Sequence, residues 1–402
     1  MVHLFEKEED ISVCTFRQYL RIDTVQPHPD YELAVKFLCH LAEDIGLAHR
    51  VIRLIPDKPI VIMTLQGKEP SLPSLLLNSH MDVVPVFPEH WTYDPLGAYK
   101  DEDGNIYARG AQDMKSIGIQ YVEAMRCLKK EGQHFLRNVH LTFVPDEEIG
   151  GHTGMALFVK SDEFKKLNVG LSLDEGVPSG DDIYRIYCAE RVKWWLKVNC
   201  NGQEGHGSRF IDNTAAEKLQ EVINKFYEFR ETQKQLLAKN PALTLGDVTT
   251  VNMTILKGGV QVNVVPAEFV ADFDIRVPPT EDFQKITQQF ESWVTDAGAT
   301  FEWIEHPEIK AVTSVDKSSP WWNAFSSVLD KMGLKYGTGV LLGGTDSRYL
   351  RELGYPAFSF SPIIETPQLM HEQDEYLNEK VFLKGLDIYT KLIAALANVP
   401  AN

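Results

Sequence analysis

Cysteine is scarce in this chain of 402 residues. The five cysteines lie far apart, at Cys14, Cys39, Cys127, Cys188 and Cys200, and no two form a Cys-x-x-Cys pair. Their odd number and wide spacing argue against a disulfide framework and against a zinc site made of cysteines. Reduced thiols are typical of the cytosol, so we expect a cytoplasmic protein.

Long apolar runs are also missing, because no segment approaches the roughly 20 residues that a membrane-spanning helix needs. The start of the chain has no basic region followed by an apolar stretch, so we expect no secretory signal. Basic side chains are outnumbered, with 40 Lys and Arg against 57 Asp and Glu, and the net charge is −17. This balance argues against binding to nucleic acid or to an anionic membrane surface.

Short apolar runs alternate with helical patterns in the first half of the chain. Buried strands are predicted at 51–54, 60–65, 75–78, 139–144 and 169–173, and an amphipathic helix is predicted over 112–130. Alternation of this kind predicts an α/β fold with a mostly parallel sheet. The same pattern returns near the C-terminus, with a helix at 321–332, a strand at 357–361 and a last helix over 382–396.

A different order of elements lies between these two parts. We predict longer strands at 194–199, 249–256 and 263–277, and helices at 214–237 and 281–297. Their order along the chain suggests the β-α-β-β-α-β order of a ferredoxin-like fold. We therefore predict an inserted ferredoxin-like α+β domain at 190–306. The remaining segments, 1–189 and 307–402, would form one discontinuous α/β domain. Two domains agree with the length of the chain.

Three adjacent carboxylates, Asp146, Glu147 and Glu148, follow the apolar run 139–145 and precede Gly150-Gly151. They repel one another, and the end of a buried strand is a costly place for them. A bound cation would offset that cost, whereas the alternative is a solvated acidic turn. The apolar residues before the cluster and the glycine pair after it favour the cation.

Other candidate ligands also lie at the ends of predicted elements. His80 and Asp82 come just after a strand, and residues two apart on an extended chain let the Asp82 carboxylate reach the His80 ring. Asp113 begins the helix 112–130, and Asp174-Glu175 ends the next strand. His371 lies in a stretch without regular pattern. Each has an ordinary explanation alone, as a cap, a turn or a strand end.

Together these residues predict a hydrolytic site with two metal ions. In α/β sheets, ligands gather beyond the carboxyl ends of the strands, where most of these residues are expected. Ligation by a mixture of imidazoles and carboxylates suits zinc, with cobalt or manganese as alternatives in vitro.

Three segments resemble the signature blocks of the M20 metallopeptidase family: 79–85 (SHMDVVP), 108–115 (ARGAQDMK) and 146–151 (DEEIGG). The likeness continues over nearly the whole chain, including 16–21, 89–91, 208–210 and 381–391. These flanking segments resemble the branch of the family that hydrolyses N-acyl-L-amino acids.

The resemblance implies five ligands for two zinc ions per subunit. Asp113 would bridge the ions, His80 and Glu175 would complete one site, and Glu148 and His371 the other. It further implies that Glu147 is the general base and Asp82 the partner of His80. A cis peptide bond between Asp113 and Met114 is also implied.

For the inserted domain the resemblance implies a lid that dimerises. His206 would then enter the active site of the partner subunit, with Asn263 beside it, and stabilise the oxyanion. From the residues alone, His206 could equally be a turn histidine between glycines.

An N-acyl amino acid ends in a carboxylate, which arginine recognises through a planar fork. Arg276 and the loop with Gly344, Thr345 and Arg348 are the candidates, although either arginine could form an ordinary salt bridge. The pair Gly343-Gly344 departs from the pattern of the N-acyl-amino-acid branch, so acyl and side-chain preferences stay open.

We therefore predict a homodimeric zinc enzyme that hydrolyses N-acyl-L-amino acids to a carboxylate and an L-amino acid. A dipeptidase or carboxypeptidase with the same site is the first alternative. A non-catalytic binding homologue is the second, and it would be favoured by a lost ligand or a substituted Glu147.

Overall fold

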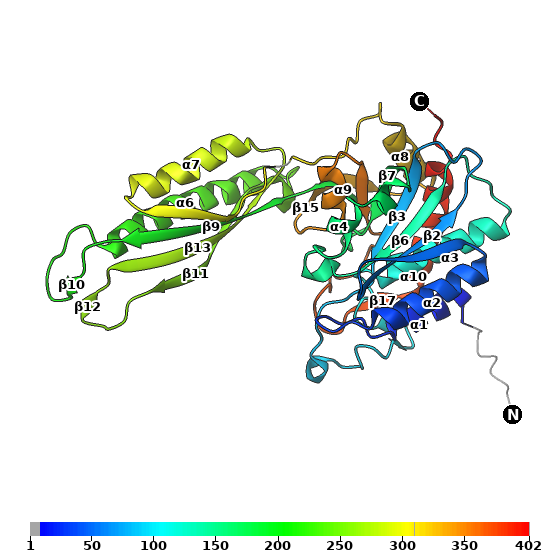
Figure 1. Cartoon of the computed structure of the whole chain (residues 1–402), viewed down its shortest axis with the longest axis horizontal. Coiled ribbons are helices and arrows are strands. Elements are labelled where there is room, and N and C mark those ends of the chain that lie inside the picture. The colour runs from blue at the N-terminus through cyan, green and yellow to red at the C-terminus, as the bar shows by residue number, and fades with distance from the viewer. Residues whose placement is uncertain (1–8, 309, 402) are drawn as a thin grey trace. The chain divides into compact units, whose positions relative to one another are not determined.

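The computed structural model describes residues 9–308 and 310–401, and the chain divides into two compact units (Figure 1). The first consists of Met1–Cys188, Thr313–Thr338 and Thr345–Asn402, and the second of Ala189–Val312 and Gly339–Gly344. The first eight residues, on which the prediction about a secretory signal depended, lie outside the described residues.

The second unit contains a segment that the predicted boundaries placed in the other domain. Gly339–Gly344 belongs to it, although the predicted insertion ended at 306. The physical reason is a set of hydrogen bonds from Arg191. Its backbone N–H donates to the carbonyl of Leu341 at 3.1 Å, and its guanidinium donates to the carbonyl of Leu342 at 3.5 Å.

An eight-stranded sheet forms the centre of the first unit, in the order β1-β2-β6-β3-β7-β16-β8-β15. The strands are β1 (Ala48–Ile55), β2 (Lys58–Leu65), β3 (Ser74–His80), β6 (Val139–Val144), β7 (Val169–Asp174), β8 (Tyr184–Glu190), β15 (Tyr336–Leu341) and β16 (Ala357–Phe360). The central strands β6, β3, β7 and β16 are parallel, and β1, β2 and β8 pair antiparallel with their neighbours. The predicted α/β fold with a mostly parallel sheet is confirmed.

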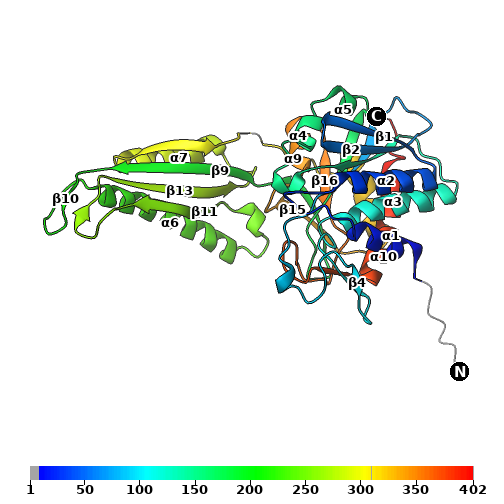
Figure 2. The same ribbon diagram turned by 60° about the horizontal axis from the view of Figure 1, so that its bottom comes forward.

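Helices cover both faces of this sheet (Figures 1 and 2). One face packs against α1 (Ile11–Leu20), α2 (Tyr31–Ile45), α3 (Lys115–Lys130), α8 (Pro320–Lys331) and α10 (Glu379–Leu396). The other packs against α4 (Met155–Phe158), α5 (Asp162–Lys165) and α9 (Ser347–Glu352). Along β3, Leu75 and Leu77 belong to the first core and Leu76 to the second. A strand buried on both faces is continuously apolar, which is why its sequence shows no alternation.

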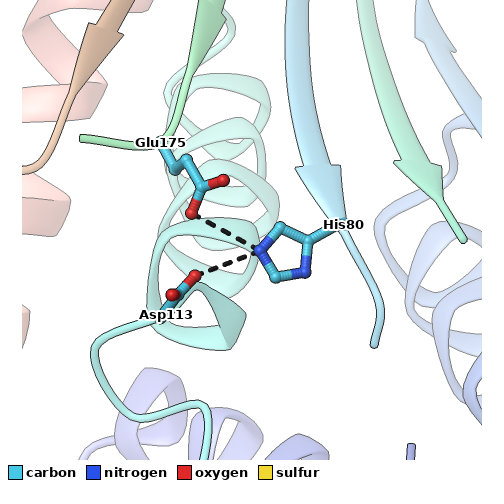
Figure 3. Close-up of side chains that lie close together, drawn as sticks. All are labelled: His80, Asp113 and Glu175. Atoms are coloured by element: carbon cyan, nitrogen blue, oxygen red, sulfur yellow. Dashed lines mark hydrogen bonds and ion pairs between the residues drawn. The ribbon is translucent and has the colours of Figure 1, made fainter. Parts of the chain in front are cut away.

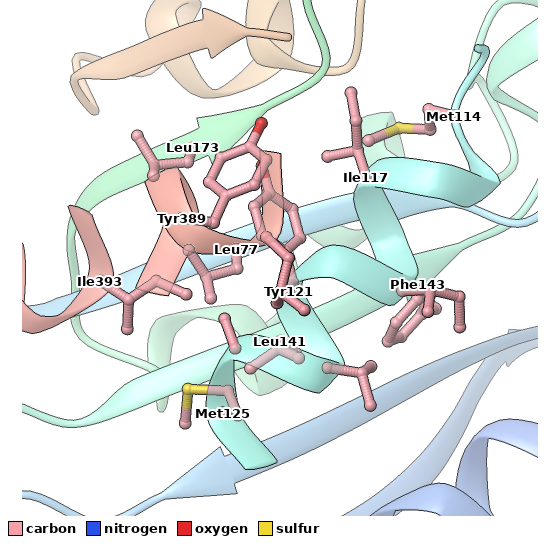
Figure 4. Packing of buried hydrophobic residues seen from close by; sticks show 14 of the residues in the cluster. Leu77, Met114, Ile117, Tyr121, Met125, Leu141, Phe143, Leu173, Tyr389 and Ile393 are labelled. Carbon is pink, nitrogen blue, oxygen red and sulfur yellow. The ribbon is translucent and has the colours of Figure 1, made fainter. Parts of the chain in front are cut away.

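The first core is tightly packed where α3 and α10 meet the sheet (Figure 4). Tyr121 of α3 and Tyr389 of α10 are both fully buried and make an edge-to-face contact with ring centroids 4.7 Å apart. Edge-to-face pairs of this kind add to the stabilisation from burial alone. They fix the helix whose first residues follow Asp113.

The second unit is a ferredoxin-like fold. Its elements are β9 (Val192–Asn201), α6 (Ala215–Lys239), β11 (Thr250–Gly258), β13 (Glu268–Val277), α7 (Phe283–Asp296) and β14 (Thr300–Glu305). The antiparallel sheet has the order β11-β13-β9-β14. Its core is aromatic, with the Phe226 ring 4.6 Å from that of Phe273 and 5.0 Å from that of Phe290. The fold class predicted for the insertion is confirmed.

One strand predicted in this unit is wrong. The run 263–277 divides into the short strand β12 (Val264–Val265) and β13, because Pro266 has no N–H to continue the ladder. Strand β12 pairs instead with β10 (Gly205–His206), in a separate two-stranded sheet.

A small sheet of β4 (Tyr99–Lys100), β5 (Asn105–Tyr107) and β17 (Tyr376–Asn378) was not predicted. It pairs Tyr107 with Tyr376, and so joins the segments that lead to Asp113 and from His371. In the described part of the chain, no helix is both long enough and apolar enough to span a membrane.

Candidate metal centre

Three neighbouring parallel strands bring candidate ligands to one edge of the main sheet. His80 is the last residue of β3, Glu175 follows β7, and the acidic cluster follows β6. Since the carboxyl ends of parallel strands meet at the same edge, this topology places all three segments together. Asp113 approaches from the loop before α3.

The first group of donor atoms consists of His80, Asp113 and Glu175, all buried (Figure 3). The Nε2 atom of His80 lies 3.1 Å from Oδ1 of Asp113 and 3.4 Å from Oε2 of Glu175. One imidazole nitrogen and two carboxylate oxygens therefore converge on one point, as zinc ligands do.

The second group consists of Asp113, Glu148 and His371. The Nε2 atom of His371 lies 3.1 Å from Oδ2 of Asp113 and 3.1 Å from Oε2 of Glu148. Asp113 thus belongs to both groups and turns a different oxygen to each histidine. This is the arrangement of a carboxylate that bridges two cations, and Asp113–Met114 has the cis peptide bond that the resemblance implied.

The hydrogen bond on the other side of His80 is the one that a metal-binding histidine makes. Its Nδ1 atom lies 2.8 Å from the backbone carbonyl of Asp82, which can only accept, so the proton is on Nδ1. In the neutral form that binds a metal, the ring would direct the lone pair of Nε2 at two carboxylates. A cation between these atoms would replace the repulsion between the nitrogen and the carboxylate oxygens with attraction, and all three groups would be its ligands.

Asp82 holds His80 differently from the prediction. The partner of Nδ1 is the backbone carbonyl of Asp82, and the nearest carboxylate oxygen is 3.7 Å away. The carboxylate instead accepts hydrogen bonds from the backbone N–H groups of Glu147 at 3.1 Å and Glu148 at 3.2 Å. It also accepts one from Gln26 at 2.8 Å. Asp82 therefore links the histidine strand to the acidic turn.

Of the three adjacent acids, Asp146 points away from the donor groups. It has a left-handed backbone, with φ of 64°, and its buried carboxylate accepts a hydrogen bond from Tyr31 at 2.7 Å. Lys58 forms an ion pair with it at 2.8 Å, and Thr153 donates to its other oxygen. Sequence reasoning missed these partners, because Lys58 and Tyr31 lie in ordinary strand and helix patterns. The turn leaves Glu148 to face His371.

The protonation equilibria reflect the crowding of negative charge. Burial raises the pKa of Glu147 well above its usual value, and the carboxylates of Asp346 and Glu148 add to that shift. Burial and Asp113 likewise raise the pKa of Glu148 and that of Glu175. Hydrogen bonds to Asp113 and Glu148 raise the pKa of His371 to about 10. The cluster holds positive charge strongly, which is also what favours a divalent cation.

Asp174, adjacent to Glu175, lies behind the donor groups. Its carboxylate accepts hydrogen bonds from Asn78 at 3.2 Å and from Ser347 at 2.9 Å. These partners engage both oxygens, and Asp174 belongs to neither donor group.

His206 ends β10 of the second unit, and Asn263 directly precedes β12, which pairs with β10. His206 is exposed, and its Nδ1 accepts a hydrogen bond from the N–H of Ser208 at 3.2 Å. The neutral ring therefore has its proton on Nε2. The N–H of Gly207 donates to the carbonyl of Asn263 at 2.8 Å, so the two predicted residues are held on paired segments.

The predicted carboxylate-binding residues have partners of their own. Arg276 forms a two-pronged ion pair with Asp274, at 2.8 and 2.9 Å. Arg348 donates to the carbonyl of Gly150 at 2.7 Å. Thr345 is buried in the first unit, and Gly344 belongs to the second. Their role in substrate binding stays a prediction.

Comparison with known proteins bears on both halves of the molecule. Residues 76–395 match the model of peptidase family M20/M25/M40. Aminoacylase-1 of Sus scrofa is 53% identical to the chain over 395 residues, which are 98% of this chain and 97% of that protein. The likeness therefore includes the second unit as well as the donor groups.

Solved structures share the fold at lower identity. The M20 family metallo-carboxypeptidase Sso-CP2 of Sulfolobus solfataricus has a TM-score of 0.69 and 18% identity, over 97% of this chain and 99% of that chain. The YXEP protein of Bacillus subtilis, described as a dinuclear metal binding peptidase, has a TM-score of 0.68 and 16% identity, over 96% and 98%. The fold, the two donor groups and the matched family support use of metal by this chain. The chain belongs to peptidase family M20/M25/M40, as its signature blocks predicted.

Proposed function

We propose that this protein is a metal-dependent amidohydrolase that cleaves N-acyl-L-amino acids into a carboxylate and a free L-amino acid. The observation that carries the proposal is Asp113, whose two oxygens face the two histidine groups at 3.1 Å each. Identity of 53% with aminoacylase-1 of Sus scrofa over nearly the whole chain supports the choice of substrate. The proposal also includes a cytoplasmic location, which the scattered cysteines support.

Two zinc ions per subunit are proposed for the donor groups. His80 and Glu175 would hold one ion and Glu148 and His371 the other, with Asp113 shared. Bound ions at such a centre polarise the amide carbonyl and lower the pKa of water towards about 7. Mixed nitrogen and oxygen donors support zinc, and no cysteine belongs to either group.

Glu147 is proposed as the general base. Its backbone N–H is held by the Asp82 carboxylate at 3.1 Å, next to Glu148 of the second group. Burial raises the pKa of its carboxyl group, which strengthens it as a proton acceptor. Glu147 would take a proton from the attacking water and pass it to the leaving amine. Asp82, by holding two backbone amides of this turn, would keep the base in place.

Arg276 and the segment from Gly344 to Arg348 are proposed to bind the carboxylate of the substrate. The guanidinium of Arg276 is already oriented by Asp274, so little further ordering is needed on binding. Thr345 and the backbone N–H groups of the loop would add donors.

The second unit is proposed as a lid through which two subunits form a homodimer. His206 would then donate from Nε2 to the oxyanion in the partner subunit, and Asn263 would lie beside it. The tautomer that Ser208 imposes on His206 supports this role, because it leaves the proton on the free nitrogen.

Mixed variant chains test the shared site. His206→Ala and Glu147→Gln homodimers should each lose most turnover, but a heterodimer contains one site with both residues intact. Equilibrated mixtures are expected to regain roughly a quarter of the wild-type rate, because half of the dimers would contain one complete site. Activity would be measured after unfolding and reassembly, with dimer exchange followed by mass spectrometry. Verified heterodimers without turnover would rule out sharing of the site between subunits.

Steady-state kinetics on two substrate classes test the function itself. N-acetyl-L-methionine and a panel of dipeptides would be compared with the same zinc-loaded enzyme. Both classes present an amide next to a terminal carboxylate, so the donor groups alone do not separate them. We expect kcat/KM to be higher for the N-acetyl substrate. A preference for dipeptides would replace the proposal with a dipeptidase, and no turnover of either with two bound ions would favour a binding homologue.

A further inference from the structure

The carboxylate of Glu375 is fully buried and contacts the backbone of the loop that leads to Asp113. Its Oε2 atom accepts hydrogen bonds from the guanidinium of Arg109 at 2.7 Å and from the N–H of Gly110 at 3.1 Å. Its Oε1 atom accepts from the N–H of Gln112 at 2.6 Å and from that of Asp113 at 3.3 Å. One side chain therefore accepts from three backbone N–H groups of an irregular loop and from an arginine.

Arg109 extends this clamp to the segment that contains His371. Its second terminal nitrogen donates to the carbonyl of Glu372 at 3.0 Å, and its guanidinium lies 5.2 Å from the centre of the Trp91 ring. The side chain is almost completely buried. The guanidinium is planar, and both of its terminal nitrogens donate hydrogen bonds, so Arg109 is held in one orientation.

Gln112 joins the same two segments from the other side. Its side-chain nitrogen donates to the carbonyls of Pro367 at 3.0 Å and Tyr376 at 2.9 Å, and its oxygen accepts from the N–H of Leu369 at 2.9 Å. The loop of the bridging carboxylate and the loop of the distal histidine therefore form one unit, with Glu375 at its centre.

We propose that Glu375, together with Arg109, is a positioning residue for the metal pair and determines how tightly both ions are held. The inference rests on the function proposed above. Asp113 must present one oxygen to His80 and the other to His371, and its backbone orientation is set by the contacts of Glu375. His371 has a left-handed backbone, with φ of 65°, and lies on the loop that Arg109 holds at Glu372. Loss of these contacts would shift the Asp113 carboxylate relative to His80 and His371.

Glu375→Gln tests the proposal with an isosteric change. The amide would direct two N–H donors at donors of Arg109 or of the backbone, so part of the clamp would open. Residues that orient metal ligands typically change metal affinity by about 10–100-fold when they are replaced. We expect both zinc ions to bind about 10–100-fold more weakly in the variant than in the wild type.

The measurement is competition for zinc between the full-length protein and a chromophoric chelator, with zinc content determined after dialysis. Turnover of Glu375→Gln should return when free zinc is raised, since the ligands themselves are intact. Asp374→Asn is the matched control. Its carboxylate lies on the same loop and accepts hydrogen bonds from the N–H and hydroxyl of Thr92, at 2.7 and 2.8 Å, without contact to Asp113. Its zinc affinity should equal that of the wild type.

The outcomes separate this inference from the proposed function. A folded Glu375→Gln that holds two zinc ions as tightly as the wild type would overturn the positioning role. Wild-type protein that binds no zinc would instead overturn the metal pair itself. If Glu375→Gln does not fold, Glu375→Asp decides. Its shorter side chain keeps the charge opposite Arg109 but cannot reach both ends of the loop, and unchanged affinity in that variant would overturn the proposal.

Discussion

Glu147→Gln is expected to lower kcat by about 10²–10⁴-fold, the contribution that general acid–base catalysis usually makes. Glutamine has the same size but cannot accept the proton of the attacking water. The fold should not change, because the contact that holds this turn runs from the backbone N–H of Glu147 to the Asp82 carboxylate. KM and zinc content should stay close to the wild-type values, since Glu147 belongs to neither donor group.

The control is a variant of the neighbouring residue that should lose turnover for a different reason. Glu148→Gln makes the same chemical change one residue away, but Glu148 faces His371 at 3.1 Å in the second donor group. Its loss of turnover should be accompanied by loss of zinc and should be partly reversed by added zinc. Glu147→Gln should not respond to added zinc. Substantial turnover in fully loaded Glu147→Gln would show that another group accepts the proton.

The fold was predictable where one physical pattern dominates a segment. The central strands β3, β6 and β7 are buried on both faces, so their runs of apolar residues identify them without any knowledge of their neighbours. The order of elements likewise predicted the ferredoxin-like unit. Prediction was wrong at Pro266, where one missing N–H divides an apolar run into two strands of different sheets. The sheet of β4, β5 and β17 includes the pairing of strands that are distant in sequence, which no local sequence pattern predicts.

The residues of the candidate site also differ in how far the sequence alone predicted them. His80, Glu148 and Glu175 follow strands, so the topology alone predicts that they meet. His371 lies in irregular chain, so its own segment says little about its role, and the resemblance to a family is what assigned it to a metal ion. The residues that hold these groups were missed, because their contacts are distant in sequence: Lys58 pairs with the Asp146 carboxylate, and Glu375 accepts from backbone N–H groups. For Asp82 the spacing of two predicted a contact between its carboxylate and the His80 ring, whereas the backbone carbonyl lies nearer, at 2.8 Å against 3.7 Å.

Asp113→Ala is expected to remove both zinc ions and, with them, turnover. It deletes the only side chain shared by the two donor groups, and each group would keep a single carboxylate and a single histidine. Replacement of residues that merely orient ligands costs about 10–100-fold in affinity, so loss of a direct ligand should cost at least about 10²-fold at each position. Zinc content would be measured by mass spectrometry of metals after dialysis, beside kcat/KM for N-acetyl-L-methionine.

Asp113→Asn refines this prediction, because asparagine keeps one oxygen and replaces the other with a nitrogen that carries two protons. That nitrogen cannot serve as a ligand, so the variant should keep at most one ion per chain. Zinc content should therefore fall stepwise from wild type to Asn to Ala, while Asp57→Ala, on an exposed turn, should leave it unchanged. Two tightly bound ions in Asp113→Ala would mean that the two histidine groups hold metal independently. The contact of each Asp113 oxygen with its own histidine would then describe hydrogen bonding rather than a bridge.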